Sequence, residues 1–172
     1  MPLSPPTPCD RSTHGWSLPE LLAVLSLIAI GTQAALPTWY DWQARMQALA
    51  VRDQLMMDLQ AARVQARQQA RALSLQALSD CAWHTPSPTD WSCGWQLVDA
   101  HSQRTLFTTP VNQPLQVRFT QSQPLVISER GDLGQVGERW TIQAGNAAHT
   151  VTHAICLSGA GRLRTVASAS CG

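Results

Sequence analysis

Two arginines near the C-terminus have the spacing of a phosphate-binding pair. Residues 158–161 form a glycine-rich turn signal, and Arg162, Leu163 and Arg164 follow it as the start of a strand. On a strand, Arg162 and Arg164 share one face about 6.6 Å apart, while Leu163 points to the other face. Guanidinium groups bind phosphate oxygens through forked hydrogen bonds. The pattern fits contacts to successive phosphates of a nucleic-acid strand, or a surface hairpin with two solvated arginines.

A second set of arginines recurs at every fourth residue, as Arg63, Arg67 and Arg71. On a helix this spacing places all three on one side. Such a row is typical of a solvated helix face. It would also suit an acidic neighbouring protein or a nucleic acid, and both interpretations stay open at this point.

The cysteines indicate disulfide bonds. Cys9 lies near the N-terminus, and the others form two local pairs, Cys81 with Cys93 and Cys156 with Cys171. Four cysteines permit three pairings, and closeness along the chain favours this one. Each bridge would close a short loop, worth about 3 kcal/mol in the chain-entropy model. Disulfides fit a head domain outside the cytoplasm.

No set of residues predicts a reaction. The chain has no nucleophile elbow, phosphate-binding loop or paired carboxylates. A metal site is the main rival to the disulfides, but no Cys-x-x-Cys spacing supports it. We therefore expect no enzyme activity, no metal and no cofactor. The metal ligands that would have to be considered are Cys81 with His84, or His149, His153 and Cys156.

Length and composition are those of one ordinary domain, or of one small domain with an appendage. The 172 residues are 44% hydrophobic and 13% charged, with a net charge of +1. This balance excludes a strongly basic protein of the histone type and a disordered acidic tail. Any affinity for nucleic acid would therefore have to come from a local group of basic residues and not from the net charge.

The longest apolar stretch lies near the N-terminus, where residues 21–35 contain no charged side chain. With its flanks it is long enough to cross a bilayer as a helix. A removed secretory signal, a signal anchor or a prepilin-type segment would each explain it. Glu20 argues against the removed signal, because an unpaired carboxylate in an apolar segment costs a few kcal/mol. Trp39, Tyr40 and Trp42 follow, and they suit a membrane interface or packing on the head or on sister subunits.

Hydrophobic periodicity predicts a long helix followed by a sheet. From Asp41 to Leu78, apolar residues recur every three or four positions, which is one helical stripe. Short alternating segments separated by turn signals come after a proline-containing loop. The fold class is therefore α+β, with a long helix packed on an antiparallel sheet. The expected strands are residues 95–99, 115–119, 125–128, 139–143, 150–157 and 162–167.

Residues 15–22, GWSLPELL, resemble the leader signature of type IV prepilins and pseudopilins. The resemblance implies cleavage after Gly15 by a prepilin peptidase and methylation of the new amine on Trp16. It also implies that Glu20 neutralises the N-terminal amine of a neighbouring subunit in a filament, an attraction strengthened by the low dielectric there. Pro37 matches the proline at which such helices bend as they leave the bilayer.

The rest of the chain resembles the FimT-type minor pilins of the GspH/FimT pseudopilin superfamily. The resemblance implies a minor pilin of a type IV pilus that binds extracellular DNA for uptake in natural transformation, without reading its sequence. Carried over by position, Gly161 presents the turn, while Arg162 and Arg164 contact phosphates. The alternatives are a GspH-like pseudopilin of type II secretion and a minor pilin that only primes assembly. The landmarks are Ala62, Arg63 and Ala66, a Cys…Cys loop, Gly94-Trp95, and a Gly-Arg-Leu-Arg tail between two cysteines.

These expectations divide the chain into four segments. Residues 1–15 are a leader that is cleaved off, and residues 16–37 are a transmembrane or filament-core helix. Residues 38–79 are an amphipathic helix, and residues 80–172 are a disulfide-bonded β-rich head. The implied partners are other major and minor pilins, prepilin peptidase, DNA phosphates and, before assembly, the inner membrane. A single-pass membrane protein with a periplasmic head would later become part of an extracellular pilus.

Overall fold

The computed structural model describes residues 16–79, 81, 87–134, 137–145 and 150–171, with residues 33–38 described by their backbone alone. The leader at 1–15, with Cys9 and Gly15, lies outside these residues, as do His84 and His149. The chain divides into two compact units, with the boundary between Thr38 and Trp39. The second unit carries the whole buried core, from Ala44 to Leu157.

One helix, α1 (Leu18–Gln69), contains the apolar segment and most of the predicted amphipathic segment. Ser17 precedes the helix, and its carbonyl accepts hydrogen bonds from the N–H groups of Glu20 and Leu21, both at 3.1 Å. In the first unit its large apolar side chains are exposed, among them Leu21, Leu22, Leu25, Ile28 and Ile30.

The sequence predicts a transmembrane or filament-core helix over residues 16–37. As far as the structure describes the chain, it contains no helix that combines the length and the apolar character needed to cross a membrane.

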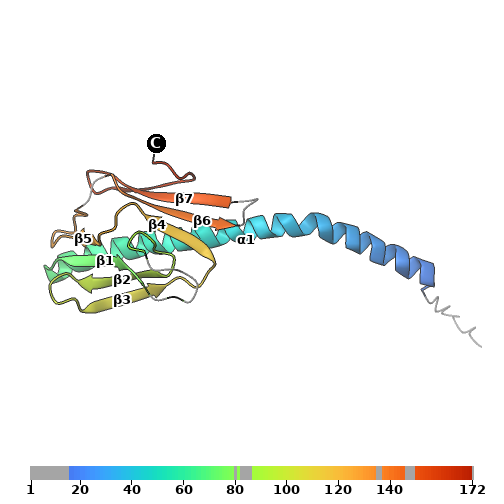
Figure 1. Ribbon diagram of the computed structural model, residues 1–172, viewed down its shortest axis with the longest axis horizontal. Coiled ribbons are helices and arrows are strands. Elements are labelled where there is room, and N and C mark those ends of the chain that lie inside the picture. Colours follow the sequence, from blue (N-terminus) through green and yellow to red (C-terminus); the bar gives the residue numbers. More distant parts are fainter. Residues whose placement is uncertain (1–15, 80, 82–86, 135–136, 146–149, 172) are drawn as a thin grey trace, which may run out of the picture. The chain divides into compact units, whose positions relative to one another are not determined.

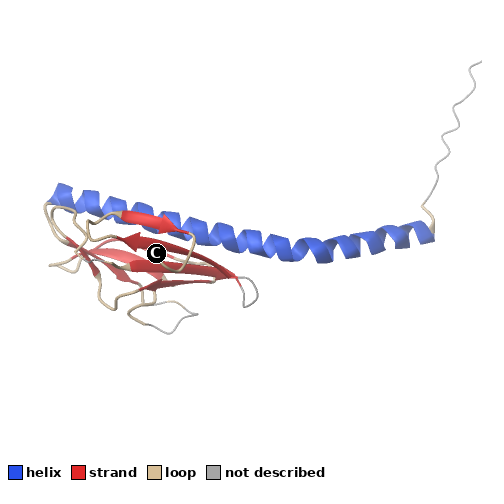
Figure 2. Ribbon diagram, turned by 90° about the horizontal axis from the view of Figure 1, so that it is seen from above, coloured by secondary structure: helices blue, strands red, loops and turns tan. Residues whose placement is uncertain are grey.

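The second half of α1 buries the predicted apolar stripe against the strands. Ala48, Val51, Leu55, Leu59, Ala62 and Ala66 are all buried, at the spacing of one helix face. Figures 1 and 2 show this half of the helix running along one side of the strands. The small alanine side chains permit close approach of the helix backbone to the sheets.

The predicted helix end was wrong, because α1 stops at Gln69 and not near Leu78. Ala70 adopts a left-handed conformation, with φ of 48°. The Arg71 N–H reaches back to the Ala66 carbonyl at 3.2 Å, and the Ala70 N–H to that of Arg67 at 3.3 Å. This pair of bonds is a Schellman motif, which ends a helix. Leu73 and Leu75 then alternate on a strand rather than extending the helical stripe.

Two antiparallel sheets make up the rest of the head. One has the strand order β3-β2-β1-β5, and the other has β4-β6-β7-β8. β4, β6 and β7 lie side by side in Figure 1. The α+β class is therefore confirmed, with two sheets. The strands are β1 (Leu73–Ala77), β2 (Gly94–Asp99), β3 (Thr105–Pro110), β4 (Leu115–Phe119), β5 (Leu125–Ile127), β6 (Arg139–Gly145), β7 (Thr150–Leu157) and β8 (Leu163–Val166).

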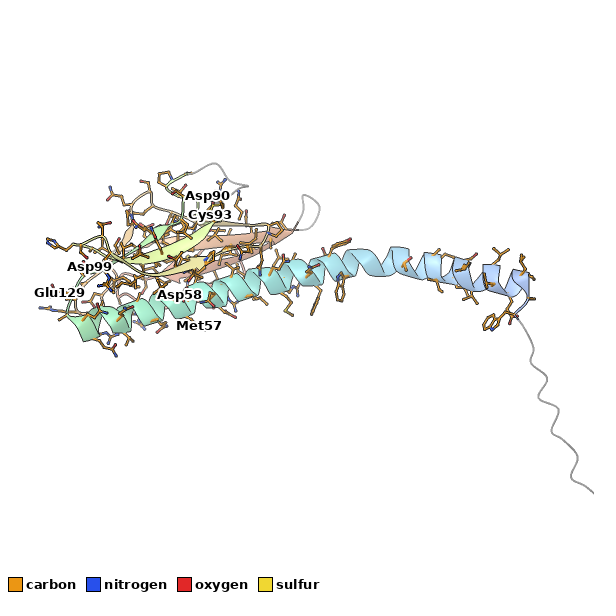
Figure 3. All side chains as sticks on the ribbon, turned by 90° about the horizontal axis from the view of Figure 1, so that it is seen from below. Met57, Asp58, Asp90, Cys93, Asp99 and Glu129 are labelled. Carbon is orange, nitrogen blue, oxygen red and sulfur yellow. A yellow bond between two sulfur atoms is a disulfide. The ribbon has the colours of Figure 1, made fainter. Side chains whose placement is uncertain are left out.

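Asp58 links α1 to the first sheet. Its carboxylate accepts hydrogen bonds from the indole N–H of Trp95 and the hydroxyl of Thr109, both at 2.8 Å. Figure 3 shows Asp58 on the side of the helix that faces the strands, while Met57 lies on the opposite side. Gln54 donates to the other carboxylate oxygen at 2.9 Å. Hydrogen-bonding groups on α1, β2 and β3 thus satisfy one another in this contact.

Candidate nucleic-acid interface

The predicted glycine-rich turn lies directly before β8. The Gly161 N–H donates to the Ser158 carbonyl at 2.8 Å, and the Ser158 N–H donates to the Arg162 carbonyl at 2.9 Å. The Ser158 hydroxyl also accepts from the Arg162 N–H at 3.1 Å. Gly161 has a φ of 69°, in the left-handed region that favours glycine. The turn is therefore fixed by its own backbone, and β8 starts one residue later than predicted.

Arg162 and Arg164 are both exposed, whereas Leu163 between them is half-buried. Leu163 packs against the hydrophobic core, so alternation places the two arginines on the outward side. Both line a hollow of about 500 Å³, together with the Cys156–Cys171 disulfide and Leu157. No aspartate or glutamate lines this hollow among the described residues. The pairing on one face that the sequence suggested is thus present in the structure.

Arg164 is held in place by the chain end. Its guanidinium donates a hydrogen bond to the Cys171 carbonyl. Cys171 is fixed in turn by its disulfide with Cys156, with the Cα atoms 5.8 Å apart. Cys156 lies opposite Arg164 in the pairing of β7 with β8. A guanidinium has five N–H donors, so this contact orients Arg164 and leaves donors for an anion.

Both predicted disulfides are confirmed. Cys81 bonds to Cys93 with a Cα separation of 5.5 Å, and Cys156 bonds to Cys171. Cys81 and Cys156, the two cysteines that the metal alternative would need, are therefore disulfide sulfurs and not thiolates. The described residues contain no group of three potential metal ligands.

Arg63 holds the glycine-rich turn in position, a role that the sequence alone does not predict. It is half-buried, and its guanidinium donates to two carbonyls, that of Gly131 at 2.8 Å and that of Gly161 at 3.2 Å. These partners lie 68 and 98 residues away. No local pattern could have revealed them. One side chain of α1 therefore fastens the turn that presents Arg162.

The arginine row on α1 does not act as one unit. Arg67 packs against Gly131, where an added Cβ would lie 2.7 Å from its Nε. Arg71 lies 3.6 Å from the Asp99 carboxylate. Backbone N–H groups of Ser102 and His101 lower the pKa of that carboxyl, and the Arg71 charge adds to the effect. Neither the interpretation as a solvated face nor that as a nucleic-acid surface describes all three arginines.

The predicted processing and assembly residues lie along the start of α1. Gly15 is outside the described residues, and Trp16 is exposed. The Glu20 carboxylate accepts a 3.5 Å hydrogen bond from the Ser17 N–H, the contact that a glutamate three residues after a helix N-cap commonly makes. Pro37 lies within α1.

The three aromatic residues after the apolar segment do not pack on the head. Trp39, Tyr40 and Trp42 are 51–60% exposed. The rings of Trp39 and Trp42 contact each other, with centroids 5.3 Å apart. A membrane interface or a sister subunit is still available as their partner.

Comparison with known proteins decides the family. The family model described as "Type II transport protein GspH" matches residues 52–161. The chain belongs to the GspH family. The match ends at Gly161, so Arg162 and Arg164 lie directly after it. No curated protein matches the chain.

Solved structures show the same fold. Two crystal structures of the type IV minor pilin FimU from Pseudomonas aeruginosa PAO1 match this GspH-family chain. One has 23% identity and a TM-score of 0.54, covering 76% of this chain and 96% of FimU. The other has 24% identity and a TM-score of 0.51, covering 72% and 99%. At these identities the likeness concerns the fold alone.

The GspH family consists of structural pilin-like subunits. The chain is accordingly a minor pilin or pseudopilin of a type IV pilus or a type II secretion system, and not an enzyme. Family membership implies other pilins and pilus machinery as partners. It also implies a membrane-anchored pilin or a place in the pilus.

Proposed function

We propose that the chain is a FimT-type minor pilin of a type IV pilus that binds extracellular DNA for natural transformation. The observation that supports this function is the hollow lined by Arg162 and Arg164, two exposed cations on one side of a fixed strand. Gly161 sets the turn, and Arg63 and the Cys156–Cys171 disulfide brace it from both ends. Preformed guanidinium pairs lose little entropy when they bind phosphate.

Binding of this kind is independent of DNA sequence. Phosphate contacts position a protein on DNA without reading bases, and no side-chain set in the tail is suited to base edges. Two phosphate contacts give a slope of log K against log salt near −1.8 and a weak affinity for one head. Useful capture therefore depends on several contacts or several subunits in one filament.

The route to the filament follows from the prepilin signature. The leader at 1–15 is cut after Gly15 by prepilin peptidase, and the Trp16 amine is methylated. The helix at 16–37 holds the subunit in the inner membrane and then enters the filament core, with a bend at Pro37. Glu20 neutralises a neighbouring amine there. The amphipathic helix from residue 38 and the head lie outside, where disulfides are stable.

The first prediction concerns the tail. Replacing Arg162 and Arg164 together with Gln in the full chain, purified in nonionic detergent, is expected to abolish the gel shift of duplex DNA. The matched control, Arg45→Gln with Arg104→Gln, removes the same charge at two exposed sites elsewhere and should keep the shift. Equal thermal unfolding temperatures establish that folding is intact. A shift that is unchanged after loss of both tail arginines would eliminate DNA binding through the tail as the proposed function.

A pseudopilin of type II secretion is the second candidate, because the matching family model carries that description. A minor pilin that only primes assembly is the third. Surface filaments labelled by antibodies to the head would favour the pilus over secretion. The gel shift separates a DNA-binding minor pilin from one that only primes assembly.

A further inference from the structure

Arg139 lies on the same sheet face as the tail arginines. In the antiparallel pairing, Arg139 is opposite Cys156, and Cys156 is opposite Arg164. Side chains in one such row point to the same face of a sheet. Trp140, the next residue, is fully buried, so the Arg139 side chain belongs to the outward face. A straight row across β6, β7 and β8 thus carries an arginine at each end.

Arg118, on the edge strand β4, lies on the same outward face in the neighbouring row. It is exposed and lies opposite Thr141, two residues along β6 from Arg139. Arg118 and Arg139 line one hollow of about 340 Å³. Among the residues that the structure describes, no acid lines this hollow. Its other hydrogen-bonding groups are Thr89, Gln116, Thr120, Thr141 and Gln143.

The acids that neighbour these strands have hydrogen-bond partners of their own. Asp90, whose backbone pairs with that of Arg118, accepts hydrogen bonds from the Ser92 N–H and hydroxyl. Glu138 accepts from the side chains of Thr120 and Gln121. Neither carboxylate lines the hollow at Arg118 or the hollow at Arg164.

We propose that Arg118 and Arg139 continue the DNA-binding surface of the tail across the outward face of the β4-β6-β7-β8 sheet. We call Arg118, Arg139, Arg164 and Arg162 the arginine track. The inference rests on the proposed function and extends it from two phosphate contacts to four. Gln116, Thr141 and Gln143 supply further hydrogen bonds to phosphate or sugar oxygens.

The spacing of the arginine track suits a polyanion. Diagonal neighbours on adjacent strands are about 7–8 Å apart, which describes Arg118 and Arg139. Arg139 and Arg164 are two strand spacings apart, about 9.5 Å. Because these steps are not collinear, the ends of the track are about 19 Å apart, the axial length of about six nucleotides of one DNA strand. A small anion could occupy one hollow, whereas only a long polyanion contacts both.

The second prediction tests the track by the salt dependence of binding. Fluorescence anisotropy with a short labelled duplex of random sequence measures Kd for the full chain in nonionic detergent. Four contacts predict a slope near −3.6, and a fourfold rise in salt weakens binding about 150-fold. Arg118→Gln with Arg139→Gln, which leaves the tail intact, should give a slope near −1.8 and only about 12-fold weakening.

Controls separate the track from the tail. Arg118→Lys with Arg139→Lys keeps both charges and should restore the steep slope, and Arg45→Gln with Arg104→Gln should leave it unchanged. If the Gln variant keeps the wild-type slope and Kd while the tail variant loses binding, the track is wrong and the tail function stands. If the wild-type chain binds no DNA, both proposals fall.

Discussion

At the scale of single residues, Asp58 shows how one carboxylate joins three elements. It accepts hydrogen bonds from Trp95 on β2 and Thr109 on β3 while it sits on α1. The Trp95 side chain is fully buried, so its indole N–H has no access to water. Removing the acceptor leaves that donor unsatisfied, at a cost of about 1–3 kcal/mol.

The third prediction follows from this contact. Asp58→Ala should lower the free energy of unfolding by about 2–4 kcal/mol, because a buried donor and a hydroxyl lose a charged acceptor. Asp53→Ala on the same helix removes only an exposed ion pair with Arg52, 2.7 Å long, and should change stability by less than about 1 kcal/mol. Urea unfolding followed by tryptophan fluorescence measures both. Similar losses in the two variants would contradict the anchoring role of Asp58.

The candidate site was predictable from sequence only where its geometry is local. Alternation alone places Arg162 and Arg164 on one side of a strand, and short loops favour the disulfides. The partners of Arg63 lie on distant loops, and the alignment of Arg139 with Arg164 depends on the register of three strands. A single sequence contains no signal for either relation.

At the scale of elements, the end of α1 depends on an unusual residue. Ala70 occupies the left-handed position of the Schellman motif, where glycine is usual. A side chain with a Cβ costs about 1–2 kcal/mol in that conformation. The end of the helix at Gln69 therefore carries the conformational strain of Ala70. The burial of Leu73 and Leu75 in β1 compensates for that strain.

The fourth prediction is a pair of identical substitutions with opposite effects. Ala70→Gly should raise the free energy of unfolding by about 0.5–1 kcal/mol, because glycine adopts positive φ without the Cβ penalty. Ala61→Gly, at an exposed position inside the same helix, should lower it by about 1 kcal/mol. Thermal unfolding of both variants gives the sign. Stabilisation by neither glycine would refute the proposed strain at the helix end.

Strands were predictable where the sequence alternates or runs apolar within clear turn signals. β4 and β7 have the predicted bounds, because buried and exposed side chains alternate or a long apolar run is present. β3 was missed, since it is an edge strand of mostly exposed or half-buried residues ending in Pro110, and proline is tolerated at such edges. β1 was assigned to the helix because Leu73 continues the helical spacing before the period changes to two.

At the scale of the whole molecule, His153 lies where β7 faces α1. It is buried and paired opposite Ile142, and neither ring nitrogen has a hydrogen-bond partner among the described residues. Burial lowers the pKa of His153, and the charges of Arg52 and Arg45 lower it further, against the opposing effect of Asp53. Protonation therefore places a cation beside two others inside the helix–sheet interface.

The fifth prediction is a loss of stability in mild acid. The folded pKa of His153 is below the ordinary value of 6.5, so the unfolded chain binds the proton first as the pH falls. Stability is therefore full above pH 6.5 and decreases below it, until the folded pKa is reached. His153→Leu should flatten this part of the profile, and His101→Leu, at an exposed site, should not. The unfolding temperatures are compared above pH 5. In that range the carboxyl of Asp99, whose pKa lies below its ordinary value of 3.8, stays ionised and does not contribute to the change.

The Cys156–Cys171 bond has a mechanical consequence if the tail arginines hold DNA as proposed. A retracting filament would pull on β8, a four-residue strand at the edge of its sheet, which hydrogen bonds alone would let peel away. The bond closes a covalent loop around this strand, from β7 to the chain end. A force applied at the two guanidinium groups would therefore be transmitted to β7 through the disulfide. Reduction of this disulfide should weaken DNA binding under an applied force far more than it weakens DNA binding at equilibrium.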